Sequence, residues 1–224
     1  MRMINRMIEP TSGTLTIDGA DVTKVNPVKL RLGMGYVIQS GGLMPHQRVI
    51  DNVATVPVLR GQSRRAARRA ALEVLERVGL DPKLANRYPA QLSGGQQQRV
   101  GVARALAADP PILLMDEPFS AVDPVVREEL QTEMLRLQNE LHKTIVFVTH
   151  DIDEAVKLGD KVAVFGPGGV LQQYDEPARS CCPTPPTTSS PASSAPTAVT
   201  GGCSSSVRPA FRCKIFGVPA TGSS

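Results

Sequence analysis

Two short stretches of this sequence, one following soon after the other, constrain the fold more than any other feature. The first is Leu92–Gln96, with the sequence LSGGQ, which leads into a run of helix-forming residues. The second is the apolar run Ile112–Met115, which ends in the acids Asp116 and Glu117. Glycines allow backbone N–H groups to approach an anion closely, and a helix N-terminus attracts negative charge. Acids at the carboxyl end of a buried strand lie where α/β proteins place ligand groups. The two stretches together predict an α/β protein that binds phosphate, a metal ion and water.

Neither stretch is specific by itself, because a Ser-Gly-Gly sequence is often only a loop and an Asp-Glu pair often begins a helix. Their order, with Asp123 and then His150 further along the chain, is much more specific. On these motifs the chain from Met1 to about Arg179 resembles the nucleotide-binding subunit of an ATP-binding-cassette (ABC) transporter. The resemblance implies a P-loop NTPase-like α/β cassette, over residues 1–179, with a mixed sheet core and a helical subdomain at about residues 49–89.

The cassettes that this chain resembles bind ATP and Mg²⁺. The resemblance implies that Asp116 and Gln39 hold Mg²⁺, partly through water, because Mg²⁺ retains part of its hydration shell. It also implies that Glu117 is the general base for the attacking water, and that His150 contacts the γ-phosphate and steadies that water. These four residues are the expected catalytic and metal-binding set.

A second expected set binds ATP from the opposite side. In the family, the residues that match Ser93, Gly94, Gly95 and Gln96 contact the ATP held by a partner cassette, and the residue that matches Asp123 lies in the loop linking the two sites. A site divided between two chains implies a dimer that closes on ATP and opens after hydrolysis. The resemblance further implies that the region around Gln39 transmits this closure to the membrane subunits.

The phosphate loop of the family, GxxGxGK[ST], has no counterpart here, because no Gly-Lys-Ser or Gly-Lys-Thr occurs in the sequence. In the family, that loop cradles the β- and γ-phosphates and opens a helix. The apolar residues Met3, Ile4, Met7 and Ile8 share one helical face, so Met1–Ile8 is expected to be the end of that helix. The resemblance therefore indicates an N-terminally truncated cassette, which we expect to bind ATP weakly and to be inactive when alone.

Composition limits the class of protein. With 224 residues, 41% of them hydrophobic, the chain can form one domain with a sizeable core. No apolar run approaches the ~20 residues that cross a bilayer, and no secretory signal is recognisable. The net charge is +4, and three positive charges with no acid lie in residues 180–224, so the rest of the chain is near +1. A nucleic-acid-binding protein with a broad basic face is therefore not expected.

Residues 180–224 differ from the rest of the chain, because Ser, Thr, Pro, Ala and Gly dominate them without periodicity. This composition predicts a disordered, low-complexity tail. All four cysteines lie in the tail without the spacing of a zinc site, so residues 1–179 have none, which fits a reducing cytosol. Family members often continue with Leu-Leu-Pro-Asn-Pro-Ala-Asn-Asp-Phe-Val. With G or C at third codon positions and a shift of one nucleotide, that segment reads as Cys181–Ser190, so we predict that a frameshift produced the tail.

Local patterns predict the elements that carry these motifs. Ser63 is a helix cap and Gly79 a helix stop, and Pro124 suits the first turn of a helix. The resulting helices are expected from Ser63 to about Val78, from the LSGGQ stretch to about Ala108, from Asp123 through Leu141 and over Asp151–Leu158. Strands are expected at 14–17, 35–39, 112–115, 144–149, 161–165 and 170–172.

The segment Ser40–His46 resembles the version found in importers of glycine betaine, choline and related osmoprotectants. We therefore expect the ATP-hydrolysing subunit of such an importer, at the cytoplasmic face of the membrane. The expected partners are a second cassette, transmembrane permease subunits and a periplasmic or lipid-anchored substrate-binding protein, without nucleic acid. The alternatives are an importer cassette for an amino acid or a metal, a non-transport cassette of repair or translation, and a non-functional fragment or regulatory partner.

Overall fold

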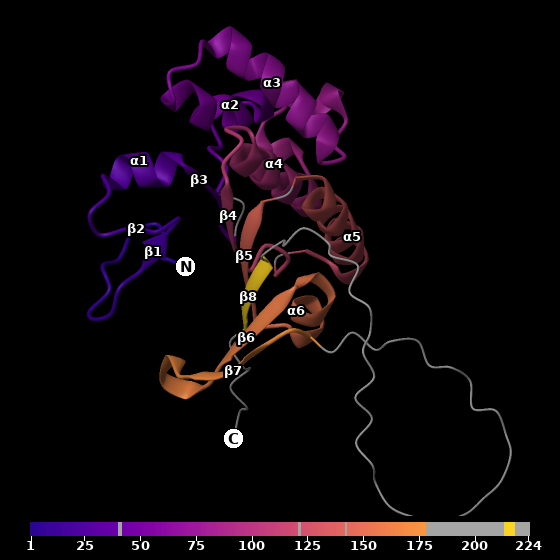
Figure 1. Cartoon of the computed structure of the whole chain (residues 1–224). Coiled ribbons are helices and arrows are strands. Elements are labelled where there is room, and N and C mark those ends of the chain that lie inside the picture. The colour runs from indigo at the N-terminus through magenta and orange to yellow at the C-terminus, as the bar shows by residue number, and fades with distance from the viewer. Residues whose placement is uncertain (40–41, 121, 142, 178–212, 218–224) are drawn as a thin grey trace, which may run out of the picture.

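The structure is a computed structural model and describes residues 1–39, 42–120, 122–141, 143–177 and 213–217. Its centre is a six-stranded sheet in the order β3-β4-β5-β8-β6-β7 (Figure 1). The strands are β3 Met34–Val37, β4 Ile112–Asp116, β5 Thr144–Thr149, β6 Lys161–Phe165, β7 Leu171–Asp175 and β8 Cys213–Gly217. All neighbouring pairs are parallel except β6 and β7, which are antiparallel. The mixed sheet with its helices confirms the predicted α/β class.

The two strands β4 and β5 are buried because their sequences are apolar along most of their length. Leu113–Met115 and Ile145–Phe147 are almost completely shielded from solvent. Strands with both faces covered are typical of parallel sheets in α/β proteins. Since β3, β4 and β5 run in the same direction, the residues that follow them emerge at one edge of the sheet.

Helices α2 Val49–Leu59 and α3 Arg64–Arg77 lie at the end of the molecule opposite β7, followed by the short turns η1 Pro82–Asn86 and η2 Pro89–Gln91 (Figure 1). The helix predicted after Ser63 is confirmed. The Ser63 hydroxyl accepts a hydrogen bond from the Ala66 N–H at 3.3 Å, and Ala67, Ala71 and Leu75 are buried. Gly79 adopts a φ of 70°, which is favourable for glycine and ends the helix there.

Three further helices cover the sheet: α4 Gly94–Leu106, α5 Pro124–Leu141 and α6 Ile152–Leu158. Their apolar faces join α2, α3 and the central strands in one hydrophobic cluster, in which the rings of Phe119 and Phe147 lie 5.6 Å apart. Burying one such large apolar side chain stabilises the fold by about 1.5–3 kcal/mol. Within the ranges described above, no helix combines the length and apolar character that crossing a membrane requires.

The helix predicted over Met1–Ile8 is wrong. This segment forms turns, Arg6 adopts a φ of 52°, and three of the four apolar residues that were expected on one helical face (Met3, Met7 and Ile8) are about half exposed. The guanidinium of Arg31 donates hydrogen bonds to the carbonyl oxygens of Asn5 and Arg6, at 3.1 and 2.7 Å. A first helical turn is costly to nucleate, and these tertiary bonds hold a different backbone conformation.

The remaining N-terminal elements form a small hairpin and a helix. The strand predicted over residues 14–17 shortens to β1 Thr16–Ile17, which pairs with β2 Ala20–Asp21 across a turn. Asp18 and Gly19 in this turn both have positive φ values, of 49° and 78°. Helix α1 Pro27–Leu32 follows, capped by the side chain of Asn26.

Two predictions near the C-terminus need correction. The strand predicted at residues 170–172 is β7, Leu171–Asp175, because its pairing with β6 extends three residues further. The disordered tail predicted for residues 180–224 is wrong for Cys213–Gly217, which forms β8 between β5 and β6. Pairing on both sides gives these five residues a structure that their composition does not indicate. The other tail residues lie outside those described.

Candidate functional site

The LSGGQ stretch places Ser93 at the start of α4, where it is the N-cap. Its hydroxyl accepts a hydrogen bond from the Gln96 N–H at 3.3 Å, and the Gln96 side chain accepts one from the Ser93 N–H at 3.0 Å. This capping box gives the backbone N–H of Gln96 an acceptor. The N–H groups of Gly94 and Gly95 also belong to the first turn, but they have no acceptor within the helix. Ser93 and Gly94 are exposed. The N-terminus of α4 (Ser93–Gln96), called the helix entrance below, can therefore donate hydrogen bonds to an anion in the solvent.

Position 95 requires a glycine, because α5 packs too closely against it to leave room for a side chain. A Cβ atom there would lie 2.5 Å from the Cγ1 atom of Val126 on α5. Asp123 caps α5, since its Oδ1 accepts a hydrogen bond from the Val126 N–H at 3.1 Å. The same short region thus fixes both helix N-termini relative to each other.

The acid pair lies where β4 ends. Glu117 follows Asp116 with a φ of 44°, a left-handed conformation that costs a non-glycine residue about 1–3 kcal/mol. Hydrogen bonds hold this turn: the Glu117 N–H donates to the Val148 carbonyl at 2.9 Å, and the Ser120 hydroxyl donates to the Glu117 carbonyl at 2.9 Å. The strained turn separates the two carboxylates, so that they meet different neighbours.

Glu117 is the centre of a three-residue cluster. The amide nitrogen of Gln39 donates a hydrogen bond to Glu117 Oε2 at 2.9 Å, and His150 Nδ1 lies 3.4 Å from the same oxygen. The side chain of His150 is 58% exposed and that of Glu117 30% exposed, so both remain open to a ligand. Asp116 instead accepts a hydrogen bond at Oδ2 from the hydroxyl of Tyr36, at 3.3 Å.

The predicted site residues therefore form two groups. Gln39, Asp116, Glu117 and His150 come from the ends of three adjacent parallel strands and gather at one edge of the sheet. Ser93–Gln96 begin α4 and contact one another. Among the described residues, no hydrogen bond or ion pair joins the two groups, and Asp123 contacts α5 rather than the acids.

Comparison with known proteins decides the family. Residues 1–120 match the ABC transporter family, which is more than half of the chain. The chain belongs to the ABC transporter family. The cassette is 51% identical over 172 residues to the choline transport ATP-binding protein OpuBA of Bacillus subtilis, covering 77% of this chain and 45% of that protein. It is 52% identical over 173 residues to the glycine betaine uptake system ATP-binding protein YehX of Escherichia coli, covering 77% of this chain and 56% of that protein.

A solved structure shares the fold of the cassette. The dimeric post-hydrolysis state of the ATP-binding cassette MJ0796, bound to ADP and Pi, is 34% identical and has a TM-score of 0.69, with 78% of each chain covered. The cassette spans about half the length of the curated relatives it matches.

Gln39, Asp116, Glu117 and His150, together called the acidic edge, include side chains of the kind that bind a magnesium ion. Asp116 and Gln39 present oxygen atoms, the ligand type that Mg²⁺ prefers, and no hydrogen bond reaches Asp116 Oδ1 from any described residue. Nowhere in the described ranges do three or more His, Cys, Asp or Glu side chains gather to form a complete metal site. A metal held by one or two protein oxygens, with water and phosphate as its other ligands, is the usual arrangement for Mg²⁺ in ATPases.

The sequence did not predict two side-chain contacts, one at the site and one in the segment that follows Gln39. Tyr36 reaches Asp116, and its burial, followed by the negative charge of Asp116, raises the pKa of its phenol. Arg104 on α4 donates a hydrogen bond to the carbonyl of Gly42, in the segment after Gln39, at 2.6 Å, and its burial lowers the pKa of the guanidinium. Both residues lie within correctly predicted elements, but their partners are distant in sequence.

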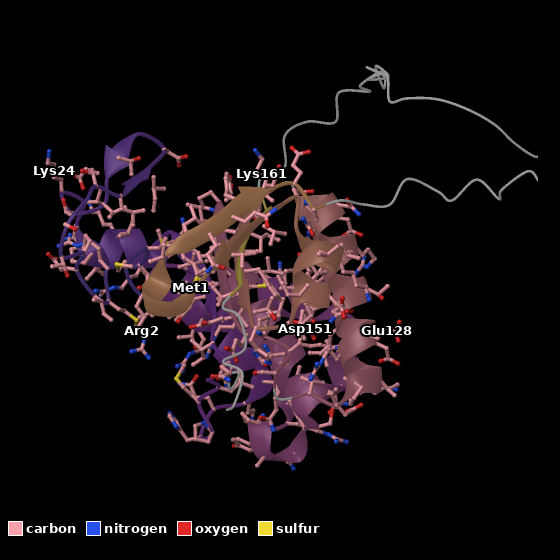
Figure 2. All side chains as sticks on the ribbon, turned by 90° about the horizontal axis from the view of Figure 1, so that it is seen from below. Met1, Arg2, Lys24, Glu128, Asp151 and Lys161 are labelled. Carbon is pink, nitrogen blue, oxygen red and sulfur yellow. The ribbon has the colours of Figure 1, made fainter. Side chains whose placement is uncertain are left out.

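A third missed feature is a polar network beneath His150. The carboxylate of Glu154, which is 6% exposed, accepts hydrogen bonds from the hydroxyl of Thr149 at 2.6 Å and from the amide of Gln131 at 3.2 Å. Asp151 caps α6, and it lies on the same side of the molecule as Glu128 of α5 (Figure 2). The network fixes the residues on both sides of His150.

Proposed function

We propose that this chain forms part of the ATP-hydrolysing subunit of an ABC importer for osmoprotectants such as glycine betaine and choline. The main support is the Gln39–Glu117–His150 cluster beside Asp116. The chain is also 51% and 52% identical in sequence to ATP-binding proteins named for choline and glycine betaine transport. The segment after Gln39, with its resemblance to osmoprotectant importers, supports the same substrate class over an amino acid or a metal.

In this proposal the residues of the acidic edge hold the metal ion, activate the attacking water and contact the γ-phosphate. Asp116 and Gln39 hold Mg²⁺, which when bound neutralises phosphate charge. Glu117 accepts a proton from the attacking water, and the Gln39 amide and His150 on its Oε2 orient its carboxylate. His150 also reaches the γ-phosphate, because its exposed ring can donate to a phosphate oxygen. General-base catalysis of this kind contributes about 10²–10⁴-fold to the rate.

The helix entrance has the complementary role. Ser93, Gly94, Gly95 and Gln96 supply hydrogen-bond donors to the ATP held by a second cassette, and Asp123 lies between the two sites. This division explains why the two groups of residues do not contact each other within one chain. Because the 224 residues contain no Gly-Lys-Ser or Gly-Lys-Thr, this chain alone is proposed to bind ATP weakly and to hydrolyse it negligibly.

The other partners follow from the importer assignment. Transmembrane permease subunits bind the cassette dimer at the cytoplasmic face of the membrane, and a periplasmic or lipid-anchored protein delivers the substrate to them. The Gln39 region, tied to α4 through Arg104 and Gly42, would transmit closure of the dimer to the permease.

A matched pair of serines tests the divided site. Ser63 and Ser93 are both helix N-caps, and each hydroxyl accepts a hydrogen bond at 3.3 Å from the N–H three residues later. Ser63→Ala and Ser93→Ala should therefore each cost about 1 kcal/mol of stability. Only Ser93→Ala should weaken association of the chain with the E. coli protein YehX in the presence of a non-hydrolysable ATP analogue. Analytical ultracentrifugation measures this association.

Two results would contradict the proposal. The first is nucleotide-dependent association that is equal for both serine variants, which would remove the helix entrance from the nucleotide site. The second is an ATP affinity in the micromolar range for the 224-residue chain alone, measured by calorimetry. Uptake of labelled glycine betaine, choline and amino acids by cells that supply the chain with a partner cassette and permease subunits tests the substrate class separately.

A further inference from the structure

A tyrosine on β3 reaches the acid at the end of β4. In the register of these parallel strands, Tyr36 lies opposite Leu114, and Asp116 is the next residue of β4 on the same face. The Tyr36 side chain can therefore extend toward the carboxyl end of the sheet, where its hydroxyl donates a hydrogen bond to Asp116 Oδ2 at 3.3 Å. This is the hydrogen bond that fixes the carboxylate of Asp116 among the described residues.

The position of Tyr36 is determined by close packing of the backbone at Gly35 and by packing of its own ring. A Cβ atom on the neighbouring Gly35 would lie 2.4 Å from the Cδ2 atom of Leu113 and 2.5 Å from the carbonyl oxygen of Ala105. Strand β3 is thus as close to β4 and α4 as a glycine permits. The aromatic ring packs against a small apolar cluster that includes Met34 and Leu114. Because backbone and ring are both held, the phenol oxygen is a fixed donor.

The contact divides the two oxygens of Asp116 between different tasks. Oδ2 accepts the hydrogen bond from Tyr36, whereas Oδ1 receives none from the described residues and is open to a cation or to its water. Carboxylates that bind metals are usually held by hydrogen bonds from neighbouring groups, and losing such a partner weakens metal binding by about 10–100-fold. The donor–acceptor distance exceeds the ~2.7–2.8 Å typical of O–H···O bonds, so we expect an effect at the lower end of that range.

We propose that Tyr36 is a positioning residue, which orients Asp116 so that its free oxygen faces a divalent cation. This inference rests on the proposed function, in which Asp116 helps to hold Mg²⁺. It adds a residue from β3 to a site otherwise built from strand ends and loops.

The full 224-residue chain offers a direct test, because it has three tyrosines, Tyr36, Tyr88 and Tyr174. Labelling with ¹³C at the tyrosine ζ carbon gives three signals, and Tyr36→Phe identifies the first. Asp116→Asn should shift the Tyr36 signal and leave the other two unchanged. Added Mn²⁺ should broaden the Tyr36 signal at lower concentration than the signals of Tyr88 and Tyr174.

Affinity for Mn²⁺ alone, measured by electron paramagnetic resonance, completes the test. Tyr36→Phe should weaken Mn²⁺ binding about tenfold. Tyr174→Phe is the matched control, since Tyr174 lies on β7, is 46% exposed and has the side chain of Lys161 over its ring, so it should leave the affinity unchanged.

Three outcomes would overturn the proposal, and they separate it from the proposed function. If Asp116→Asn does not shift the Tyr36 signal, the two side chains are not in contact, and the proposed function is unaffected. Equal Mn²⁺ affinity in wild type and Tyr36→Phe removes the positioning role but keeps Asp116 as a metal ligand. Mn²⁺ affinity that Asp116→Asn does not change removes the metal role of Asp116, and both proposals fail together.

Discussion

Thr149 links the core of the sheet to the loop that carries His150, and its hydroxyl has two partners. It donates a hydrogen bond to the Glu154 carboxylate at 2.6 Å and accepts one from the Asp151 N–H at 3.0 Å. Thr149 is 3% exposed and Glu154 6% exposed, so water cannot replace the hydroxyl if it is removed. The substitution Thr149→Val keeps the shape of the side chain and removes both bonds.

The expected cost follows from these contacts. Hydrogen bonds to a charged group are worth about 1.5–3 kcal/mol, and a buried acceptor that loses its partner also loses solvation. Thr149→Val should therefore lower the free energy of unfolding by about 2–3 kcal/mol. The matched control is Thr132→Val, because Thr132 is exposed on α5 and donates to the Glu128 carbonyl within its own helix at 2.9 Å. That control should change stability by less than ~0.5 kcal/mol.

Urea denaturation followed by circular dichroism measures both variants, with the slope of the unfolding free energy checked for constancy. The double variant with Glu154→Gln should show a coupling energy, since the two side chains share one hydrogen bond. Equal stability of Thr149→Val and Thr132→Val would refute the reasoning, because it would mean that the buried network beneath His150 contributes nothing.

Two further variants test packing and charge. Gly35→Ala should destabilise the fold by about 1–3 kcal/mol, because its Cβ would meet the Ala105 carbonyl, whereas Gly33→Ala meets nothing closer than 3.4 Å and should be nearly neutral in the same urea assay. Lys143 donates to Asp109 at 2.6 Å, and this hydrogen bond, followed by the lysine charge, lowers the pKa of Asp109. A lowered carboxyl pKa stabilises the fold above the unfolded value near 3.8 and loses that effect as the pH falls through the folded value. Asp109→Asn should therefore be less stable than wild type at neutral pH and equal to it in strong acid; a stability difference that does not change with pH would contradict this.

Local sequence patterns predicted the elements that carry the motifs. Ser63 and Gly79 bound α3, and the apolar run before Asp116 is β4, because caps and buried runs act over a few neighbouring residues. The family resemblance implied that Gln39, Glu117 and His150 act at one site. In the structure the parallel strands that precede them bring the three side chains into contact.

The missed features depend on contacts between distant segments. Met1–Ile8 has helical periodicity, but hydrogen bonds from Arg31 hold it as turns. Strand β8 lies in a low-complexity region, and its pairing with β5 joins residues far apart in the chain. The Tyr36–Asp116 contact depends on the register between two strands, which no local pattern specifies. In each case the deciding interaction is tertiary.

The central claim is that the helix entrance of this chain and the ATP of another cassette form one site. We propose to label the chain with ¹⁵N-glycine, add the unlabelled complete E. coli relative with ATP and Mn²⁺, and record the amide signals. The account predicts that Mn²⁺ broadens the signals of Gly94 and Gly95 only when the second cassette is present, while the signal of Gly61, beside the N-cap of α3, stays sharp. Sharp Gly94 and Gly95 signals in a complex shown to contain ATP, or equal broadening without the second cassette, would contradict it.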